Sequence, residues 1–542
     1  MSSLLIITIL LPLAAAVLLL LLDPKAPAER ARSVALLATL ATLGVSWGLA
    51  SQFVALPEIS PEARNPIEPR MELRQPWLTL GTNAAGEPVR LEFYLGIDGI
   101  SLSLILLTTL LCVSSVLVSW TAITDRAAEF YAALLILETG LIGVFCAFDL
   151  MLFYVFFEFT LIPLYFLVGL WGGPLRKYAA GKFFIYTLAG SLITLLGLVS
   201  LVITVYNRTG LATPFSIPDL AIALEANPLL PEMQSTLFLA IAAGFMVKVP
   251  LFPFHTWLPL AHVEAPTAGS VLLAGVLLKL GSYGFLRLCL PMLPAGCEQT
   301  GMPLIAALSV IGIVYGSFCA LAQNDIKKMV AYSSVAHLGF CMLGLFALNT
   351  EGITGGVLQM INHGLSTGAL FCLVGMFYER YHTRMLSDLG GLASKLPRLG
   401  VLMVFISFAS IGLPGLNGFV GEVLALAGMF KVQTPQMNGI VYSAIGAAGV
   451  VLGAWYLLGM LQQAFFGPLK EPHHDGHHAE DIPDLNPREV LTLAPLAAMC
   501  LYLGLFPQTL IDLIGPDVEG VARLYQRPAA SEVIASQDEM LP

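Results

Sequence analysis

Long apolar stretches recur along the whole chain, separated by short polar connections. Each stretch is about 20 residues or longer, the length that a helix needs to cross about 30 Å of hydrocarbon. The pattern predicts an all-α integral membrane protein with about fourteen transmembrane helices. We expect them near residues 3–22, 33–55, 98–120, 130–149, 150–170, 183–206, 235–255, 268–290, 302–322, 329–349, 356–379, 399–430, 438–466 and 491–514.

The composition agrees with a lipid environment. Hydrophobic residues make up 57% of the chain and charged residues only 11%, against about 25% charged in soluble domains. The eight cysteines show no Cys-x-x-Cys spacing, so we expect no zinc or iron–sulfur ligation. There is no glycine-rich phosphate-binding motif, and nothing in the net charge of −10 indicates nucleic-acid binding. Redox chemistry is therefore expected outside this chain.

The distribution of Lys and Arg predicts the orientation. If the N-terminus lies outside, the inner loops carry roughly twice as many basic residues as the outer ones, as the positive-inside rule requires. An even number of crossings then leaves both termini on the outer side. The inner basic residues would be Lys25, Arg30, Arg32, Arg126, Arg176, Lys177, Lys182, Lys327, Lys328, Arg380, Arg384, Lys395, Arg398, Lys470 and Arg488.

A few ionisable side chains fall inside the predicted spans. Such groups are costly in hydrocarbon and usually mark an ion pathway. Acids, lysines and imidazoles together can hold and pass a proton where they converge and water fills the gaps. The residues are Glu158, Lys248, Lys279, Arg287, His337, His363 and Glu422, with His255, His262 and Glu264 near a span end.

Two of the spans contain helix-breaking residues beside a charge. Lys248 precedes Pro250 and Pro253, and the run 411–415, which contains Pro414 and two glycines, precedes Glu422. Two interrupted helices of this kind suggest an inverted repeat, as in many transporters. We therefore expect helices 1–3 with an outer loop 56–95 in 1–129, five-helix repeats in 130–290 and 302–466, and a connecting loop, last helix and tail in 467–542.

Several of these residues have a structural explanation as well. Arg287 lies within a turn of its span end, where snorkelling to the interface is the expected role. For His255, His262 and Glu264, a solvated or hinge-capping role fits as well as a relay role.

The charged residues inside the predicted spans and one histidine tract also have explanations other than a role in ion transfer. A Glu158–Lys248 pair could exist to offset the roughly 3 kcal/mol cost of an unpaired charge in the membrane. Separating that pair would nevertheless change the proton affinity of both groups, so it could also act as a switch. The tract His473–His478 is expected to be an exposed loop with at most adventitious metal binding.

Several longer motifs resemble one known family, the antiporter-like subunits of respiratory complex I, the proton-pumping NADH:quinone oxidoreductase. The resemblance extends from Ile97 to about residue 466. It rests on FFEFTLIPLYFL at 156–167, GFMVKVPLFPFH at 244–255, HTWLP at 255–259, EAPTAGS at 264–270, LLK at 277–279, YSSVAH at 332–337 and NHGLS at 362–366.

The residue beside the second break indicates a type within this family. A glutamate there, Glu422, is typical of the M type, whereas relatives of the L, N and cation-antiporter types are expected to carry lysine. The resemblance implies a proton relay coupled to quinone reduction elsewhere. Leu260 stands where many relatives carry aspartate, which puts in doubt any role for an acid at that position and leaves Glu264 as the nearby carboxylate. The relay would comprise Glu158, Lys248, Lys279, His337, His363 and Glu422.

The resemblance also implies a setting. The chain would be a subunit of an oxidoreductase in a bacterial plasma membrane, beside L- and N-type subunits and smaller membrane subunits. NADH, FMN, iron–sulfur clusters and quinone would be held by partner subunits of the complex and none by this chain. Two alternatives stay open: a subunit of a multi-component Na⁺/H⁺ antiporter or of a membrane-bound hydrogenase-type complex, and a scaffold that conducts nothing.

Overall fold

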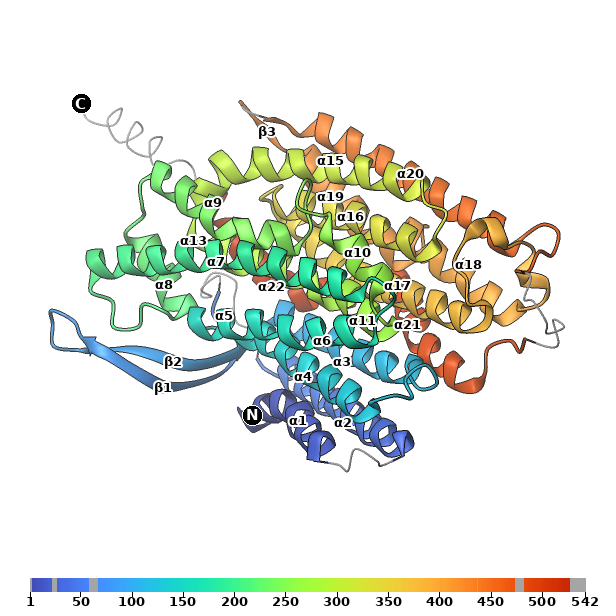
Figure 1. The fold of residues 1–542 in the computed structure, drawn as a ribbon. Helices are drawn as coiled ribbons and strands as arrows, with labels where there is room; N and C mark the ends of the chain where they lie inside the picture. Colours follow the sequence, from blue (N-terminus) through green and yellow to red (C-terminus); the bar gives the residue numbers. More distant parts are fainter. Residues whose placement is uncertain (1, 22–26, 58–66, 436, 473–481, 527–542) are drawn as a thin grey trace.

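The fold is a bundle of helices with a β-hairpin projecting from one end (Figure 1). The computed structural model describes residues 2–21, 27–57, 67–435, 437–472 and 482–526. Among these, twelve helices are long and apolar enough to cross a membrane, and α18 and α19 are shorter apolar helices. The all-α membrane class is confirmed, while the count of fourteen crossings and the two five-helix repeats stay predictions.

Helices in the first part of the chain follow the predicted spans closely. Short polar residues start several of them: Asp149 accepts hydrogen bonds from the backbone N–H groups of Met151 and Leu152 at 2.9 and 3.1 Å. Asp149 therefore ends one crossing and caps the next. The helices are α1 Ser2–Leu21, α2 Ala28–Val54, α3 Gly99–Val118, α4 Ala127–Cys146, α5 Leu150–Phe159, α6 Leu161–Trp171, α7 Arg176–Thr209 and α8 Ile217–Ala226.

The first predicted break is present. Helix α9, Pro231–Lys248, ends at the lysine, and α10, Trp257–Glu264, begins nine residues later. Pro250 and Pro253 lie between them, where they remove helical hydrogen bonds. The next crossing is helical throughout but contains π-helical turns at Leu273–Leu277 and Phe285–Cys289, between α11 Thr267–Leu272, α12 Lys279–Gly284 and α13 Leu290–Met292.

The second predicted break is also present. Helix α18, Pro397–Ile411, is separated from α19, Asn417–Phe430, by a loop in which Gly412 and Gly415 have φ values of 80° and 90°. Only glycine adopts that conformation without strain. Around this pair lie α14 Pro294–Gly296, a π-helical turn at Cys297–Gly301, α15 Met302–Leu321, α16 Ile326–Leu345, α17 Thr350–Tyr381, α20 Gly439–Phe465 and α21 Pro487–Leu505.

Two helical segments occupy the centre of the bundle. The apolar windows of Thr350–Tyr381 and Thr267–Met292 are completely buried. Helix α17 packs tightly on α19: a Cβ at Gly355 would lie 2.2 Å from the backbone nitrogen of Ala425. Close backbone approach through glycine is typical of membrane helices. The centre is therefore held rigidly around the second broken helix.

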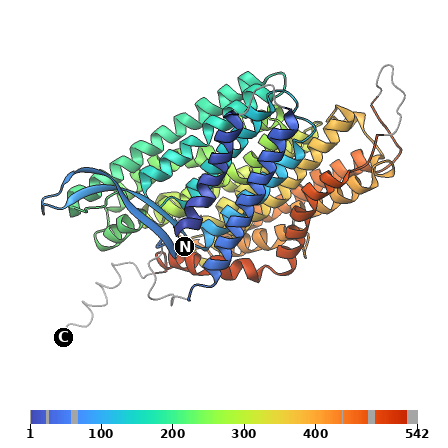
Figure 2. The same ribbon diagram turned by 90° about the horizontal axis from the view of Figure 1, so that it is seen from below.

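The outer loop 56–95 contains regular structure that was not predicted from the sequence. Strands β1, Met71–Thr82, and β2, Pro88–Ile97, form an antiparallel hairpin that extends beside the bundle (Figure 2). Arg74 on β1 donates to Glu92 on β2 at 2.7 Å, and it ties the hairpin to α8 by pairing with Asp219. Pairing across the turn stabilises these strands outside the bundle. A second, minimal hairpin joins β3, Gln433–Thr434, to β4, Met437–Asn438.

The last predicted span, 491–514, is also corrected. Helix α21 ends at Leu505, and a separate amphipathic helix, α22 Gln508–Arg523, follows after Pro507. Its apolar residues Ile514 and Val518 are buried, and Asp517 accepts a hydrogen bond from the Gly99 backbone N–H at 2.7 Å. The apolar run therefore crosses a helix boundary that hydrophobicity alone does not reveal.

Candidate proton-relay site

Lys248 ends α9 at the first break, deep inside the bundle. Its side chain is 1% exposed, and within the described part of the chain its ammonium has no hydrogen-bond partner. The ammonium lies 4.6 Å from the centre of the Phe157 ring. A cation over an aromatic face is stabilised by the ring quadrupole, more strongly where water is excluded. This lysine therefore contacts an aromatic ring and makes no hydrogen bond to an anion among the described residues.

Glu158 follows Phe157 on α5 and is partly buried. The predicted direct pairing of Glu158 with Lys248 is not found, because the lysine bonds to no side chain among the described residues. The two groups are still within electrostatic reach of each other. The described residue that contacts the ammonium is the aromatic ring of Phe157. The first half of the site thus keeps its two charges apart.

Lys279 and His363 meet at the centre of the bundle. The lysine ammonium donates to Nδ1 of His363 at 2.7 Å and also to the carbonyl oxygen of Ala274. Both side chains are buried. Ala274 belongs to the π-helical turn just before Lys279, and such turns frequently occur at functional sites. This contact brings together two predicted residues that are 84 positions apart.

His337 and Glu422 form the other end of the same cluster. Nδ1 of His337 lies 3.0 Å from Oε1 of Glu422, which also accepts a hydrogen bond from the Gln359 amide at 3.0 Å. The centres of the His337 and His363 rings are 5.7 Å apart. On each ring, Nε2 has no partner among the residues described. Lys279, His363, His337 and Glu422 therefore form one continuous polar line, hereafter the central line.

The second break holds Glu422 against α17. The side-chain amide of Asn362 donates to the Asn417 carbonyl oxygen at 2.7 Å, and Asn417 returns a bond to the Asn362 carbonyl at 3.2 Å. A Cβ at Gly412 would lie 2.9 Å from Oε2 of Glu422. The loop backbone thus approaches the carboxylate closely, and this approach requires glycine.

A polar hollow of about 530 Å³ opens at the end of the bundle opposite the hairpin. Lys327 and Glu264 line it. The buried Lys327 ammonium donates to the Ala265 carbonyl at 2.6 Å, and Glu264 Oε2 accepts from the Leu175 backbone N–H at 2.8 Å. A solvated role for Glu264 is thus excluded, because its side chain is bonded and largely buried.

His262 lies between this hollow and the central line. It is fully buried, so it does not take the solvated role considered above, and it stacks on Phe371 with the ring centres 4.5 Å apart. Neither ring nitrogen has a partner in the described residues, and the ring is within electrostatic reach of both Lys327 and Lys279. A buried imidazole with two unsatisfied nitrogens is the kind of group that bridging water completes.

Arg287 corrects another expectation. It does not snorkel to the interface but is buried and paired with Asp98, the N-cap of α3. Its guanidinium also lies 4.7 Å from the Phe148 ring centre. His255 is likewise buried, between Phe252 and Tyr315, with ring centres 5.8 and 5.3 Å away. Both residues stand outside the central line.

Sequence reasoning missed two polar residues of the spans. Gln359, a ligand of Glu422, lies one turn before His363 on α17, so helical spacing could have indicated it. Glu138 lies in the middle of α4 and was overlooked although it falls inside a predicted span. The tract His473–His478 lies outside the described residues. No group of three His, Cys, Asp or Glu within the described ranges could hold a metal ion.

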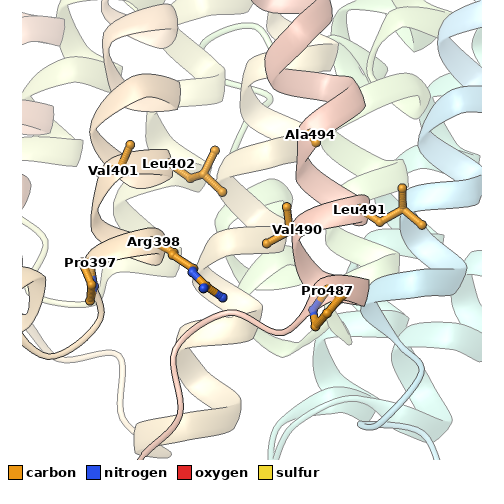
Figure 3. A pocket seen from close by; sticks show the side chains of 8 residues that line it. All are labelled: Pro397, Arg398, Val401, Leu402, Pro487, Val490, Leu491 and Ala494. Atoms are coloured by element: carbon orange, nitrogen blue, oxygen red, sulfur yellow. The ribbon is translucent and has the colours of Figure 1, made fainter.

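A surface hollow of about 740 Å³ lies well away from the relay residues, between α18 and α21 (Figure 3). Apolar side chains of Val401, Leu402, Val490 and Leu491 line most of it, with Arg398 near the helix starts. Arg398 is the one ionisable residue among those that line this hollow in the described structure. None of the predicted relay residues lines this hollow.

Comparison with known proteins decides the family. The profile described as NADH:quinone oxidoreductase/Mrp antiporter, TM, matches residues 147–455. NADH-quinone oxidoreductase subunit M of Rhodobacter capsulatus is 42% identical over 533 residues, which cover 97% of each chain. The chain belongs to the subunit M branch of this antiporter-like family. All six predicted relay residues of this M-type chain lie within the matched region.

Solved structures agree on the fold. A chain of respiratory complex I from Thermus thermophilus with bound NADH superposes with a TM-score of 0.80 at 30% identity, covering 96% of the M-type chain and 99% of the other. A chain of the Mrp complex from Dietzia sp. DQ12-45-1b gives a TM-score of 0.74 at 19% identity, covering 96% of both chains. The latter similarity shows a shared fold alone.

Proposed function

We propose that this M-type subunit translocates protons in an NADH:quinone oxidoreductase, coupling quinone reduction in partner subunits to proton transfer through its own buried side chains. The observation that carries the proposal is the central line from Lys279 to Glu422. Lys279 and His363 are within hydrogen-bond distance, as are His337 and Glu422, and the two imidazole ring centres are 5.7 Å apart. Buried ionisable groups in a membrane are costly and are usually functional.

The geometry supports a stepwise transfer. The Lys279 ammonium donates to Nδ1 of His363, so this nitrogen can receive the proton while Nε2 releases another. A water molecule between the free Nε2 atoms of His363 and His337 would bridge the gap. His337 then donates from Nδ1 to Oε1 of Glu422. Each step moves one proton and leaves the imidazole neutral.

The first half supplies the electrostatic control. Lys248 and Glu158 lie within electrostatic reach of each other, so a change of charge at either one alters the field on the other. In a medium of low effective dielectric this coupling is stronger than in water. Quinone reduction in a partner would act on Glu158, and Lys248 would pass the change toward Lys279.

Proton uptake would begin at the polar hollow opposite the hairpin. Lys327 at its wall and the buried His262 lead toward Lys279. The predicted orientation makes this the inner side of a bacterial plasma membrane, with both termini outside. The expected membrane partners are L- and N-type and smaller membrane subunits, and other subunits of the complex would hold NADH, FMN, iron–sulfur clusters and quinone. The R. capsulatus relative, named as an oxidoreductase subunit, supports this assignment.

The test is proton pumping in inverted membrane vesicles, recorded beside NADH:quinone electron transfer, with Glu158→Gln. The matched control is Glu129→Gln. Glu129 lies on α4, the helix before α5, and its exposed carboxylate pairs with Arg126. We expect assembled Glu158→Gln complexes to lose both activities while the control keeps them. Full pumping with full electron transfer in Glu158→Gln would contradict the proposal. If the parent showed no NADH-linked activity, Na⁺/H⁺ exchange would be the better assignment.

A further inference from the structure

Glu138 is a buried acid that the proposed relay does not use. It lies in the middle of α4, and its side chain is completely shielded from solvent. Neither carboxyl oxygen has a hydrogen-bond partner within the described part of the chain. No cation interacts with it there; the only side chain that does is the thiol of Cys112 on α3.

Its depth in the bundle matches that of Glu158. Helices α4 and α5 are antiparallel neighbours joined by a short bend, and Glu138 lies nine residues before Ala147 while Glu158 lies nine after Asp149. The helices pack closely, since a Cβ at Gly143 would lie 2.4 Å from the Phe156 ring. Equal spacing from the bend places both acids at about the same level, because each helical residue rises about 1.5 Å.

Unsatisfied polar atoms continue from Glu138 toward the end opposite the hairpin. On α3, Cys112 is followed one turn later by Ser115, whose hydroxyl is buried and has no partner among the described residues. On α4, Tyr131 lies two turns before Glu138, and its hydroxyl, equally without a bonded partner in the described chain, is near Arg32. These groups offer places for water along one seam between α3 and α4.

The energetics argue against a purely structural role. A buried carboxyl that makes no hydrogen bond costs about 1–3 kcal/mol relative to one in water, and an ionised carboxylate without a cation costs several kcal/mol more. The thiol of Cys112, a weak donor, offsets little of this cost. A protonated acid in such a place can release its proton only when water reaches it, which is the behaviour of a gated proton site.

We propose that Glu138 is an additional proton-exchanging residue of the first half, which holds a proton between α3 and α4. The carboxyl O–H bond breaks as its proton passes to water in the seam beside Cys112, Ser115 and Tyr131. A proton from the Tyr131 end restores the acid, so nothing is consumed. This inference rests on the proposed pumping function, because the exchange needs a field that changes during turnover.

The test uses the assembled complex in inverted vesicles, with Glu138→Gln, Glu138→Asp and the control Glu129→Gln. Gln keeps the shape and polarity but holds no exchangeable carboxyl proton. We expect Glu138→Gln to lower the protons pumped per NADH by about twofold or more, and Glu138→Asp to restore part of the loss. Infrared difference spectra during turnover should lose one protonated-carboxyl band in Glu138→Gln and keep it in the control.

The outcomes separate the two proposals. If Glu158→Gln abolishes pumping while Glu138→Gln pumps at the parent ratio with all carboxyl bands present, the role of Glu138 is wrong and the proposed function stands. If Glu158→Gln also pumps at the parent ratio, the proposed function itself fails. Should Glu138→Gln not assemble, Tyr131→Phe removes only one hydroxyl: a lower pumping ratio supports the seam, and an unchanged ratio overturns it.

Discussion

The two halves of the bundle treat their charges differently. In the first half, Lys248 has no hydrogen-bond partner in the described chain and faces an aromatic ring, with Glu158 nearby but not bonded to it. In the second half, four side chains follow one another in space as neighbours, in the order Lys279, His363, His337 and Glu422. One half separates charges, and the other connects them.

This difference assigns different work to the halves. Separated charges in a dry interior respond strongly to each other's charge state, because little water screens them. Groups within hydrogen-bond distance can transfer a proton from one to the next without a large side-chain movement. The first half is therefore suited to sensing and switching, and the second to conduction. Perturbing each half should produce different kinds of defect.

Lys279→Ala should have the largest effect, because it removes the first donor of the central line. Loss of a positioned proton-transfer group typically costs about 10²-fold or more, so we expect pumping to fall at least that far. Pumping by vesicles, normalised to assembled complex, checks this. Lys431→Ala is the matched control, since this exposed lysine pairs with Glu351 at the surface. Equal pumping in both variants would contradict a conducting central line.

Arg287→Met should affect stability and not conduction, because Arg287 is bonded to Asp98 and stands apart from the line. Breaking a buried ion pair costs about 3–5 kcal/mol. We expect much less assembled complex on native gels, but normal pumping per complex. The double variant with Asp98→Asn should recover part of the assembly. Normal assembly with lost pumping would instead make Arg287 part of the relay.

Gly421→Ala should weaken the second half more mildly. The added Cβ would lie 2.7 Å from Oε1 of Gln359 and 3.0 Å from its backbone nitrogen, so Gln359 must move away from Glu422. We expect pumping to fall by roughly threefold to tenfold, in line with the partial loss of one hydrogen bond, worth about 0.6–1.4 kcal/mol. Gly459→Ala is the control, because nothing lies within 4 Å of its Cβ position. The same pumping in both would show that Gln359 is dispensable.

Phe157→Leu should have the smallest effect and would sharpen the contrast between the halves. It removes the ring over Lys248, a contact worth about 0.5–2 kcal/mol. The ammonium could then approach Glu158, so we expect slower coupling, with pumping lowered about twofold to fivefold. Phe166→Leu, an exposed site one helix further, serves as control. Unchanged coupling in Phe157→Leu would show that the ring does not keep the charges apart.

Much of the fold follows from local sequence pattern. Continuous apolar runs predict the membrane crossings, and Pro250, Pro253 and Gly412 mark the breaks because their backbone chemistry is local. The hairpin was missed although β1 and β2 carry β-branched and aromatic residues, because its stability depends on pairing between two strands. The boundary between α21 and α22 was missed because hydrophobicity does not report a change of direction.

The residues of the site could be selected from sequence, but their contacts could not. Lys279 and His363 are identifiable as rare polar groups in apolar spans, yet their contact depends on how α17 packs against the π-helical turn. Arg287 was misjudged for the same reason, since its partner Asp98 is 189 positions away. Glu158 and Lys248 were expected to pair from charge alone, but the Lys248 ammonium lies over the Phe157 ring and makes no hydrogen bond to any described residue.

The most direct test of the central line is the ratio of protons pumped to NADH oxidised in Glu422→Gln, measured in inverted vesicles on assembled complex. Gln keeps the hydrogen bonds to His337 and Gln359 within reach but cannot accept the transferred proton. The account predicts that the ratio falls well below that of the parent, while the complex assembles fully. A parent-like ratio would contradict the claim that protons pass through Glu422.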